Sequence, residues 1–329
     1  MRFSFRALQV PAGVLGAALS VAGFAQASKA TLAQADAALQ AGEADKALAL
    51  IGSLPQGGAN SAEARNLKCR VQFTLQQWDS AAQECAQAVR LDDQNSGFHM
   101  WLGRALGEKA GRASFISAYS LGKQVRAEFE QAVRLDPHSP SALTDLGFFY
   151  RDAPAVMGGG LDKAEGVAAQ LDRVEPARAH QLRADIAEQR KDYGAAEREL
   201  KQAIAVSAHP AFQWSVLASF YQRRERWPEM EWAIHNCVTA AARDKTAGVA
   251  LYDGAGVLIK TQRDPALAAK MLQDYLAGNS KTDEAPAFVA HLRLARLKQN
   301  LGDTAGAQQD QAAAFAMAHE FRPTQELRH

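Results

Sequence analysis

The chain has 329 residues, and 47% of them are hydrophobic, which is enough for a continuous core. Its 37 basic and 36 acidic residues leave a formal charge of +1. Such a balance offers no electrostatic footprint for nucleic acid or for an anionic membrane surface, so neither is expected as a partner.

The first 27 residues have the pattern of an export signal. Arg2 and Arg6 precede an apolar run over residues 7–25, and Ala25, Gln26 and Ala27 form the small-x-small triplet that precedes cleavage. Cleavage after Ala27 would give a periplasmic or secreted protein with a formal charge of −1, because both arginines are lost. An uncleaved anchor is the alternative, but a proline and three glycines in the run make a poor spanning helix. No stable membrane insertion is therefore expected after cleavage.

Residues 28–321 repeat roughly every 34 residues. The clearest copy places large and small apolar residues at helical spacing on two successive helices, at Trp214, Leu217, Ala218, Tyr221, Trp227 and Ile234. This spacing resembles the tetratricopeptide repeat (TPR), a helix-turn-helix unit that buries its apolar face only against neighbouring copies. The resemblance implies an all-α, right-handed superhelix (a TPR solenoid) of about seven or eight helical hairpins, followed by a flexible tail at residues 322–329.

Eight units align on the small residues of their two helices. The first, at 30–54, is a degenerate cap. The eighth, at 288–320, has the polar second helix expected of a terminal cap, with Gln308, Gln309, Asp310 and Gln311. Between them lie the clear copy and the units at 61–93, 96–137, 140–176, 177–208 and 249–280.

Two adjacent units depart from the period. The unit at 96–137 is about ten residues too long, with its extra residues at 111–122. The next has a Gly-rich insertion at 153–160, which contains Met157, Gly158, Gly159 and Gly160. Insertions in a solenoid project as loops on one face, often the binding face, so this pair is expected to supply accessory contacts. The glycines could also cradle an anion, but a hairpin turn is favoured because Asp162 would occupy the anion position.

The two expanded units, from Trp101 to Pro137 and from Ala142 to Gly160, resemble a group of exported bacterial TPR proteins. The first is also distantly similar to the regulator of microtubule dynamics family, through its Ser/Gly/Lys stretch before Phe129 and its Leu135-Asp136-Pro137 ending. These resemblances imply the repeat architecture.

Three cysteines follow the export signal. Cys69 falls on the first helix of its unit and Cys85 on the second, at positions that face each other in many TPR hairpins. An oxidising compartment would allow a disulfide between them. The alternative is that both, like Cys237, are small buried apolar residues. The spacing lacks a Cys-x-x-Cys pair, so no metal is expected.

Positions that line the concave groove of such a superhelix form the candidate partner-binding surface. They are Arg70, Phe73, Arg104, Phe148, Arg151, Asp185, Glu188, Ser219, Gln222, Arg223, Lys260 and Arg296. This mixture suits a short peptide held by salt bridges and by one or two apolar anchors, with Phe73 and Phe148 as exposed candidates. The asparagines by which some relatives grip a C-terminal carboxylate are missing at the matching positions.

Residues for catalysis do not converge anywhere in the sequence. His99 and His180 occupy packing positions, and the pairs Asp92-Asp93 and Asp283-Glu284 lie in turns, where solvated charge is expected. No cofactor is expected. The sequence therefore predicts a non-enzymatic scaffold in the cell envelope that binds a protein or peptide. A protein binding a small ligand or glycan fragment, with both insertions folded over the groove, and an enzyme with groups converging near residues 157–160 are the alternatives.

Overall fold

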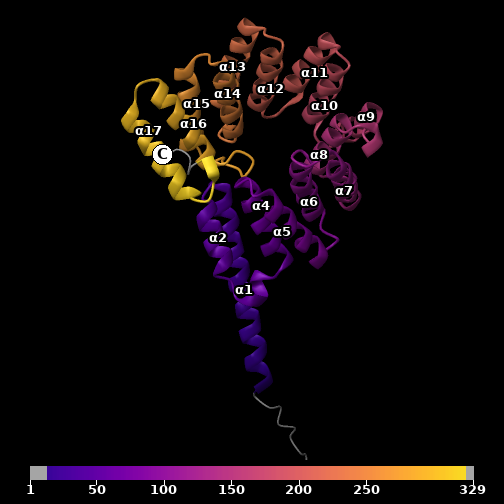
Figure 1. Ribbon diagram of the computed structural model, residues 1–329, viewed down its shortest axis with the longest axis vertical. Coiled ribbons are helices and arrows are strands. Elements are labelled where there is room, and N and C mark those ends of the chain that lie inside the picture. The colour runs from indigo at the N-terminus through magenta and orange to yellow at the C-terminus, as the bar shows by residue number, and fades with distance from the viewer. Residues whose placement is uncertain (1–12, 324–329) are drawn as a thin grey trace, which may run out of the picture.

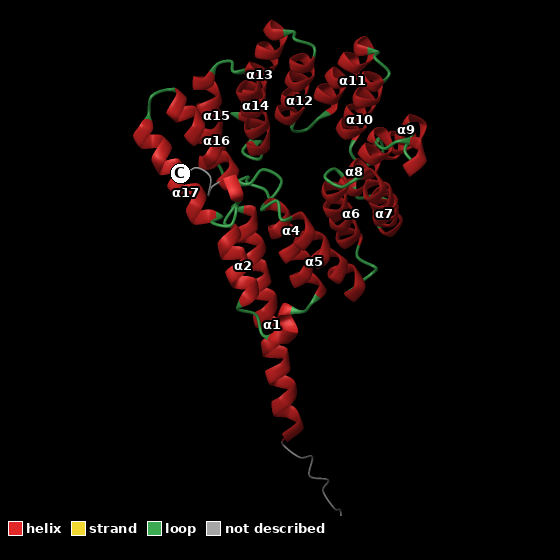
Figure 2. Ribbon diagram, viewed as in Figure 1, coloured by secondary structure: helices red, strands yellow, loops and turns green. Residues whose placement is uncertain are grey.

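The computed structural model describes residues 13–323. Seventeen α-helices and one short 3-10 helix make up this part of the chain, which contains no β-strand (Figure 2). The predicted all-α superhelix is confirmed. Arg2 and Arg6 of the predicted export signal, and residues 324–329 of the predicted tail, lie outside the described residues.

Helices that are consecutive in sequence pack as eight antiparallel hairpins (Figure 1). The first hairpin pairs α1 (Gly13–Gln40) with α2 (Ala44–Gly52), and the short α3 (Gln56–Ala59) follows. The others are α4 (Ala62–Thr74) with α5 (Trp78–Leu91), α6 (Ser96–Ala110) with α7 (Phe115–Leu135), α8 (Pro140–Asp152) with α9 (Leu161–Leu171), α10 (Pro176–Gln189) with α11 (Tyr193–Val206), α12 (Pro210–Arg223) with α13 (Trp227–Ala241), α14 (Gly248–Thr261) with α15 (Pro265–Ala277), and α16 (Ala287–Asn300) with α17 (Thr304–Met317).

Local sequence signals start and stop these helices. Proline stands in the first turn of α8, α10, α12, α13 and α15, where its missing N–H leaves no intrahelical bond unmade. Turns between paired helices use a residue in the left-handed region, such as Gly42 (φ 82°) and Gly302 (φ 86°). Such a residue lets the last carbonyl groups of a helix find donors.

The signature aromatics pack between hairpins, as expected. Trp101 and Tyr221 are buried, and Trp214, Trp227 and Tyr150 are half-buried. Small residues let the backbones approach: a Cβ at Gly103 would lie 2.5 Å from the ring of Phe129. The repeat pattern thus encodes close contact between neighbouring helices as well as apolar burial.

The two ends of the superhelix meet, which the sequence analysis did not anticipate. One buried cluster contains Leu39 of α1, Val71 of α4 and Phe288 of α16, and Phe321 beyond α17 also belongs to it. A Cβ at Gly42 would lie only 2.6 Å from the backbone nitrogen of Ala287. The chain therefore closes into a ring. In each hairpin the first helix lies on the inside of this ring (Figure 1).

The prediction that the eighth unit is a terminal cap is wrong. Gln308 and Gln309 are exposed, but Ala314 of the same helix is buried in the cluster that joins the two ends. Beyond the helix, the Gln77 side chain donates a hydrogen bond to Glu320, over 2.9 Å. Helix α17 is therefore an internal contact of the ring.

The two departures from the period have different structures. Residues 111–122 do not form the expected long loop: only residues 111–114 form a turn, and α7 begins at Phe115, so residues 115–122 extend this helix. Residues 153–160 do form a loop, with a 3-10 turn (Ala155–Met157) and Gly158 in the left-handed region. The two lie side by side: a Cβ at Gly122 would lie 2.7 Å from the sulfur of Met157.

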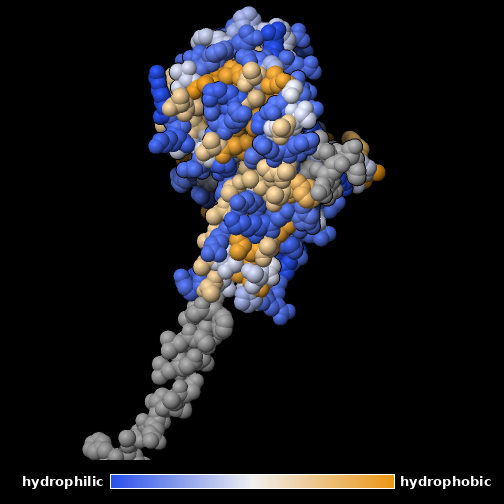
Figure 3. Space-filling model, turned by 90° about the vertical axis from the view of Figure 1, so that its left-hand side faces the viewer, coloured by the Kyte–Doolittle hydropathy of each residue, from blue (hydrophilic) through white to orange (hydrophobic). Residues whose placement is uncertain are grey.

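Helix α1 extends away from the ring and runs through the predicted cleavage position, so cleavage after Ala27 would shorten it (Figure 1). Within the described residues, no helix has both the length and the hydropathy needed to cross a membrane. On the side of the molecule in Figure 3, patches of hydrophobic residues lie among hydrophilic ones.

Candidate functional site

The predicted groove residues all lie on first helices of hairpins, which face the inside of the ring (Figure 1). Arg70 and Phe73 are on α4, Arg104 on α6, Phe148 and Arg151 on α8, Asp185 and Glu188 on α10, Ser219, Gln222 and Arg223 on α12, Lys260 on α14, and Arg296 on α16. We call this inner surface the concave face. The structure thus brings these positions onto one surface, although they span more than 200 residues of sequence.

Most charged residues of the concave face pair with each other from one hairpin to the next. Arg104 donates to Asp145 of α8 over 2.6 Å, and Arg151 of α8 donates to Asp185 of α10. Arg223 of α12 donates two hydrogen bonds to Glu188, at 2.7 and 2.9 Å. Burial raises the pKa of Asp185, and the nearby Arg151 lowers it. These arginines are already satisfied, so they are poor candidates for new salt bridges to a partner.

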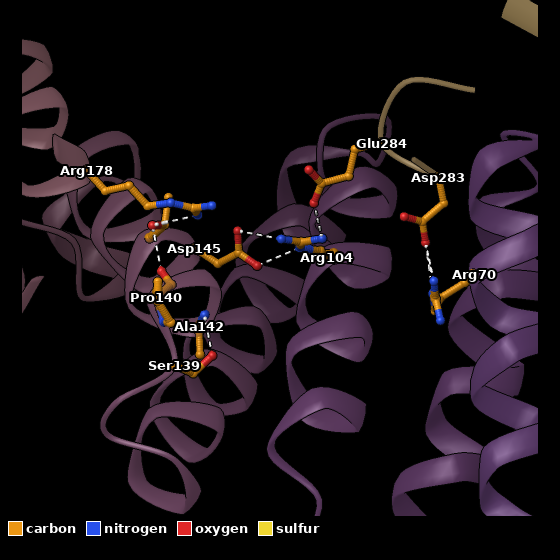
Figure 4. Close-up of polar contacts among 10 residues, drawn as sticks. Arg70, Arg104, Ser139, Pro140, Ala142, Asp145, Arg178, Asp283 and Glu284 are labelled. Atoms are coloured by element: carbon orange, nitrogen blue, oxygen red, sulfur yellow. Dashed lines mark hydrogen bonds and ion pairs between the residues drawn. The ribbon is translucent and has the colours of Figure 1, made fainter. Parts of the chain in front are cut away.

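The position of Asp145 is set by its own helix. Ser139 caps α8 by accepting a hydrogen bond from the Ala142 N–H, and Pro140 fixes the first turn (Figure 4). Arg178 of α10 reaches Thr144 on the same helix over 3.4 Å. Asp145 therefore faces Arg104 across the boundary between two hairpins.

A loop at residues 278–286, which we call the closure loop, completes this network across the ring. Asp283 accepts from Arg70 over 2.8 Å, and Glu284 accepts from Arg104 over 2.8 Å (Figure 4). The expectation that both carboxylates are solvated turn residues is wrong for Asp283, which is buried. The hydroxyl of Tyr275 donates to the Ala285 carbonyl and holds the loop in place.

Phe73 and Phe148 are less exposed than expected. Phe73 packs edge-on against Trp78 and Trp101, with ring centroids 5.1 and 5.5 Å apart. The guanidinium of Arg151 lies over the ring of Phe148 at 4.5 Å. Both phenylalanines are half-buried because neighbouring side chains cover one face of each ring.

These two phenylalanines border an apolar cavity of about 600 Å³, which we call the hollow. Helices α4, α6, α7 and α8 form its walls, and the Gly-rich loop closes one side through Met157. Gly103 and Gly107 form part of its lining on α6, and Val125 and Phe129 do so on α7. Both departures from the repeat period thus meet at a single opening in the concave face.

Sequence reasoning missed the lining of the hollow. Gly103, Gly107 and Gly111 recur every four residues, and Ala118, Gly122 and Val125 follow on the next helix. Two facing stripes of small residues leave space between helices, and this signal was available in the sequence. The same signal also marks close packing, as at Gly103, so the sequence alone does not distinguish the two.

The Gly-rich loop does not offer free donors to an anion. The N–H groups of Gly158, Gly159 and Gly160 donate to the carbonyl groups of Ala155, Pro154 and Tyr150. A Cβ at Gly159 would collide with the carbonyl oxygen of Ala153, so the loop needs glycine there to close tightly. Its contribution is to position Met157 against α7.

The histidines hold hairpins together. His99 of α6 bonds Glu128 of α7 at 2.6 Å, His180 of α10 bonds Glu199 of α11 at 2.7 Å, and His291 of α16 bonds Asp310 of α17 at 2.7 Å. Each pair joins the two helices of one unit. Among the described residues, no three His, Cys, Asp or Glu side chains gather as metal ligands would.

Cys69 of α4 and Cys85 of α5 are joined by a disulfide, with Cα atoms 5.3 Å apart. The bond links the two helices of one hairpin, next to Arg70. Cys237 is free and buried, and burial raises the pKa of its thiol to about 12. A thiol with such a pKa is a poor nucleophile at neutral pH.

Paired helices stacked around a concave face define the class: the chain has the fold of a TPR protein. No protein-family model matches the chain, and no curated protein matches its sequence. Among solved structures, 59% of this chain aligns with 98% of TTC0263, a thermophilic TPR protein of Thermus thermophilus, at a TM-score of 0.50 and 19% identity.

Two other solved structures are similar over different lengths. MamA aligns over 49% of this chain and 87% of its own, at a TM-score of 0.39 and 18% identity. A chain of the APC/C hetero-tetramer Cut9-Hcn1 aligns over 84% of this chain and 50% of its own, at a TM-score of 0.40 and 12% identity. The alignment with TTC0263, at 19% identity, supports the fold alone.

The closure loop gives a matched test. We expect Asp283→Asn to lower the free energy of unfolding by about 2 kcal/mol, because it leaves the buried side of Arg70 without its carboxylate. Glu284→Gln should cost less than about 1 kcal/mol, because this side chain is 62% exposed. Urea denaturation of both variants measures the difference. Equal losses would show that Asp283 does not hold the loop.

Proposed function

We propose that this protein is a non-enzymatic scaffold of the cell envelope that binds a protein or peptide partner through the hollow in its concave face. The observation that carries the proposal is the hollow itself: an apolar opening beside Arg104, which is already paired with Asp145. TPR folds commonly present such concave surfaces to partners.

The chemistry of the hollow favours an apolar anchor on the partner. Its lining is mainly Phe, Val, Met, Ala and Gly, while Arg104, Glu108 and Asp152 stand around it with ion-pair partners of their own. Burying one large aliphatic or aromatic side chain contributes about 1.5–3 kcal/mol. Affinity would come from this anchor, and the paired charges would orient the peptide.

An apolar stripe on α7 runs from the hollow to an exposed phenylalanine. Phe115, Ala118, Gly122, Val125 and Phe129 share one face of α7. Val125 and Phe129 are buried, but Phe115 is 81% exposed. Phe115 therefore offers a second apolar contact to a partner seated in the hollow.

The cell-envelope assignment rests on the export signal at residues 1–27 and on the Cys69–Cys85 disulfide, since disulfides persist in oxidising compartments. The non-enzymatic assignment rests on the hydrogen bonds of the histidines and carboxylates. His99, His180 and most inward-facing carboxylates bond to partners within a hairpin or in the next one. Among the described residues, no nucleophile, base and orienting group therefore lie together.

Filling the hollow tests the binding proposal. A Cβ at Gly107 would meet nothing within 4 Å, so Gly107→Leu places a side chain in the cavity without a backbone clash. We expect peptides selected by display against the wild-type protein to share an aromatic or large aliphatic residue. Gly107→Leu should weaken their binding at least about tenfold, since it takes the space of that residue.

Gly166→Leu is the matched control. Gly166 is also helical, on α9, is also free of neighbours within 4 Å of its Cβ, and lies outside the hollow. The control should bind the selected peptides like the wild type. If both variants bind equally well, with circular dichroism unchanged, the hollow is not the partner site.

Export is tested separately. Expressed with residues 1–27 in a Gram-negative bacterium, the protein should be recovered by osmotic shock with Ser28 at its N-terminus. Alkylation after denaturation without reductant should label Cys237 only, because Cys69 and Cys85 are bonded. A cytoplasmic protein that keeps residues 1–27 would contradict the envelope assignment.

A further inference from the structure

The concave face contains a second cavity on the opposite side of the ring from the hollow. It has a volume of about 290 Å³ and lies among α12, α14 and α16. Its charged and polar lining includes Ser219, Gln222, Arg223, Asp253, Lys260 and Arg293. We call it the polar cavity.

Asp253 lacks the arginine hydrogen-bond donor that other inward-facing carboxylates have. Asp145, Asp185, Glu188 and Asp283 each accept hydrogen bonds from an arginine, whereas Asp253 makes no hydrogen bond or ion pair with any described residue. Burial raises its pKa to about 6. The nearby Arg293 guanidinium lowers the pKa of Asp253 and so offsets part of the cost of burying this carboxylate.

Two of the three cations that line the polar cavity form no ion pair with a described carboxylate. Lys260 lies two turns beyond Asp253 on α14, and it forms no ion pair with a described carboxylate. Arg293 of α16 lies over the ring of Tyr252 at 4.2 Å and likewise has no such partner. Only Arg223, at the border with the previous hairpin, is engaged, with Glu188.

Glycine keeps the cavity open between these charges. Gly256 lies on α14, one turn after Asp253, and lines the cavity. A Cβ there would lie 3.4 Å from a guanidinium nitrogen of Arg293, so a larger side chain would displace the arginine. The polar cavity is thus open at position 256, where the chain has no side chain.

We propose that the polar cavity binds a small zwitterion, a free amino acid or a short peptide. The ligand's ammonium group donates to Asp253, and its carboxylate accepts from Arg293 and Lys260. The Ser219 hydroxyl and the Gln222 amide remain for the rest of the molecule. This inference does not depend on the hollow or on the partner proposed for it.

The arrangement selects for both charges at once. A simple anion would gain Arg293 and Lys260 but would be repelled by Asp253, and a simple cation would meet the opposite difficulty. A ligand with both groups satisfies all three. A cavity of about 290 Å³ is at the small end of the range for ligand sites, which suits an amino acid or dipeptide.

Calorimetric titration of the full mature chain with the free amino acids and a set of dipeptides tests the proposal. At least one zwitterion should bind at neutral pH, and acetate and alkylammonium ions should not. The comparison of amino acids with dipeptides identifies which of the two fits. The proposal is overturned if no zwitterion binds at millimolar concentration or if acetate binds equally well.

Affinity should depend on pH in a definite direction. The ligand's ammonium needs the ionised form of Asp253, so binding should weaken about tenfold from pH 7 to pH 5 as this carboxyl is protonated. The other charges that face Asp253 are Arg293 from α16, Lys260 from its own helix, Arg223 from α12 and Glu284 from the closure loop. Affinity that is constant over this range would contradict a role for Asp253.

Asp253→Asn should reduce the affinity at least tenfold and remove the pH dependence. The free variant should melt no lower than the wild type, because Asp253 makes no hydrogen bond or ion pair with a described residue that the substitution would break. Asp274→Asn, the same change on the exposed face of α15, is the control and should keep both affinity and pH dependence. Binding by Asp253→Asn at wild-type affinity would overturn the proposal, whatever the outcome of the Gly107→Leu test.

Discussion

The apolar contact between the first and last hairpins determines the rest of this structure. Phe288 is fully buried against residues of α1 and α4, which precede it by more than 200 residues. Each large side chain buried there contributes roughly 1.5–3 kcal/mol, which a solenoid with two free ends would not gain. Repeat proteins usually end in polar caps, but here each end covers the other.

Closure of the ring explains how charged residues of the concave face find ion-pair partners. Because the last hairpin returns to the first, the loop at 278–286 reaches Arg70 and Arg104 and adds Asp283 and Glu284 to the ladder of ion pairs. Most of the inner surface is thereby neutralised. Two regions remain. The hollow among α4, α6, α7 and α8 has an apolar lining that is open to a partner, and the polar cavity among α12, α14 and α16 has charged side chains without ion-pair partners.

The sequence was sufficient to predict the hairpins, because their signals are local. The spacing of Trp214, Leu217 and Tyr221 reflects contacts within one repeat and with its neighbour, and it yields the helices and their inward faces directly. Ring closure was not predictable in this way, since no periodicity relates Leu39 to Phe288. The same limit applied to Asp283, whose partner Arg70 lies 213 residues away.

The sequence was sufficient to predict where the candidate site lies, but it did not predict which of its side chains are paired. The groove residues do lie on one face, but alignment to a repeat cannot tell whether Arg104 is free or paired with Asp145. It also placed residues 111–122 in a loop, since the periodicity does not distinguish a longer helix from an insertion. The hollow and the polar cavity depend on which side chains are missing, as at Gly107 and Gly256, and that requires the packed structure.

The distance between the two ends tests the closed ring most directly. Nitroxide labels at Gln77→Cys and Glu320→Cys should broaden each other's continuous-wave electron paramagnetic resonance spectrum, because the side chains of Gln77 and Glu320 are in hydrogen-bond contact in the ring. Cys237 is buried and the other two cysteines are bonded, so the labels can be placed selectively. A folded, doubly labelled protein whose spectrum is no broader than the sum of the two singly labelled spectra would have an open solenoid and would contradict the account.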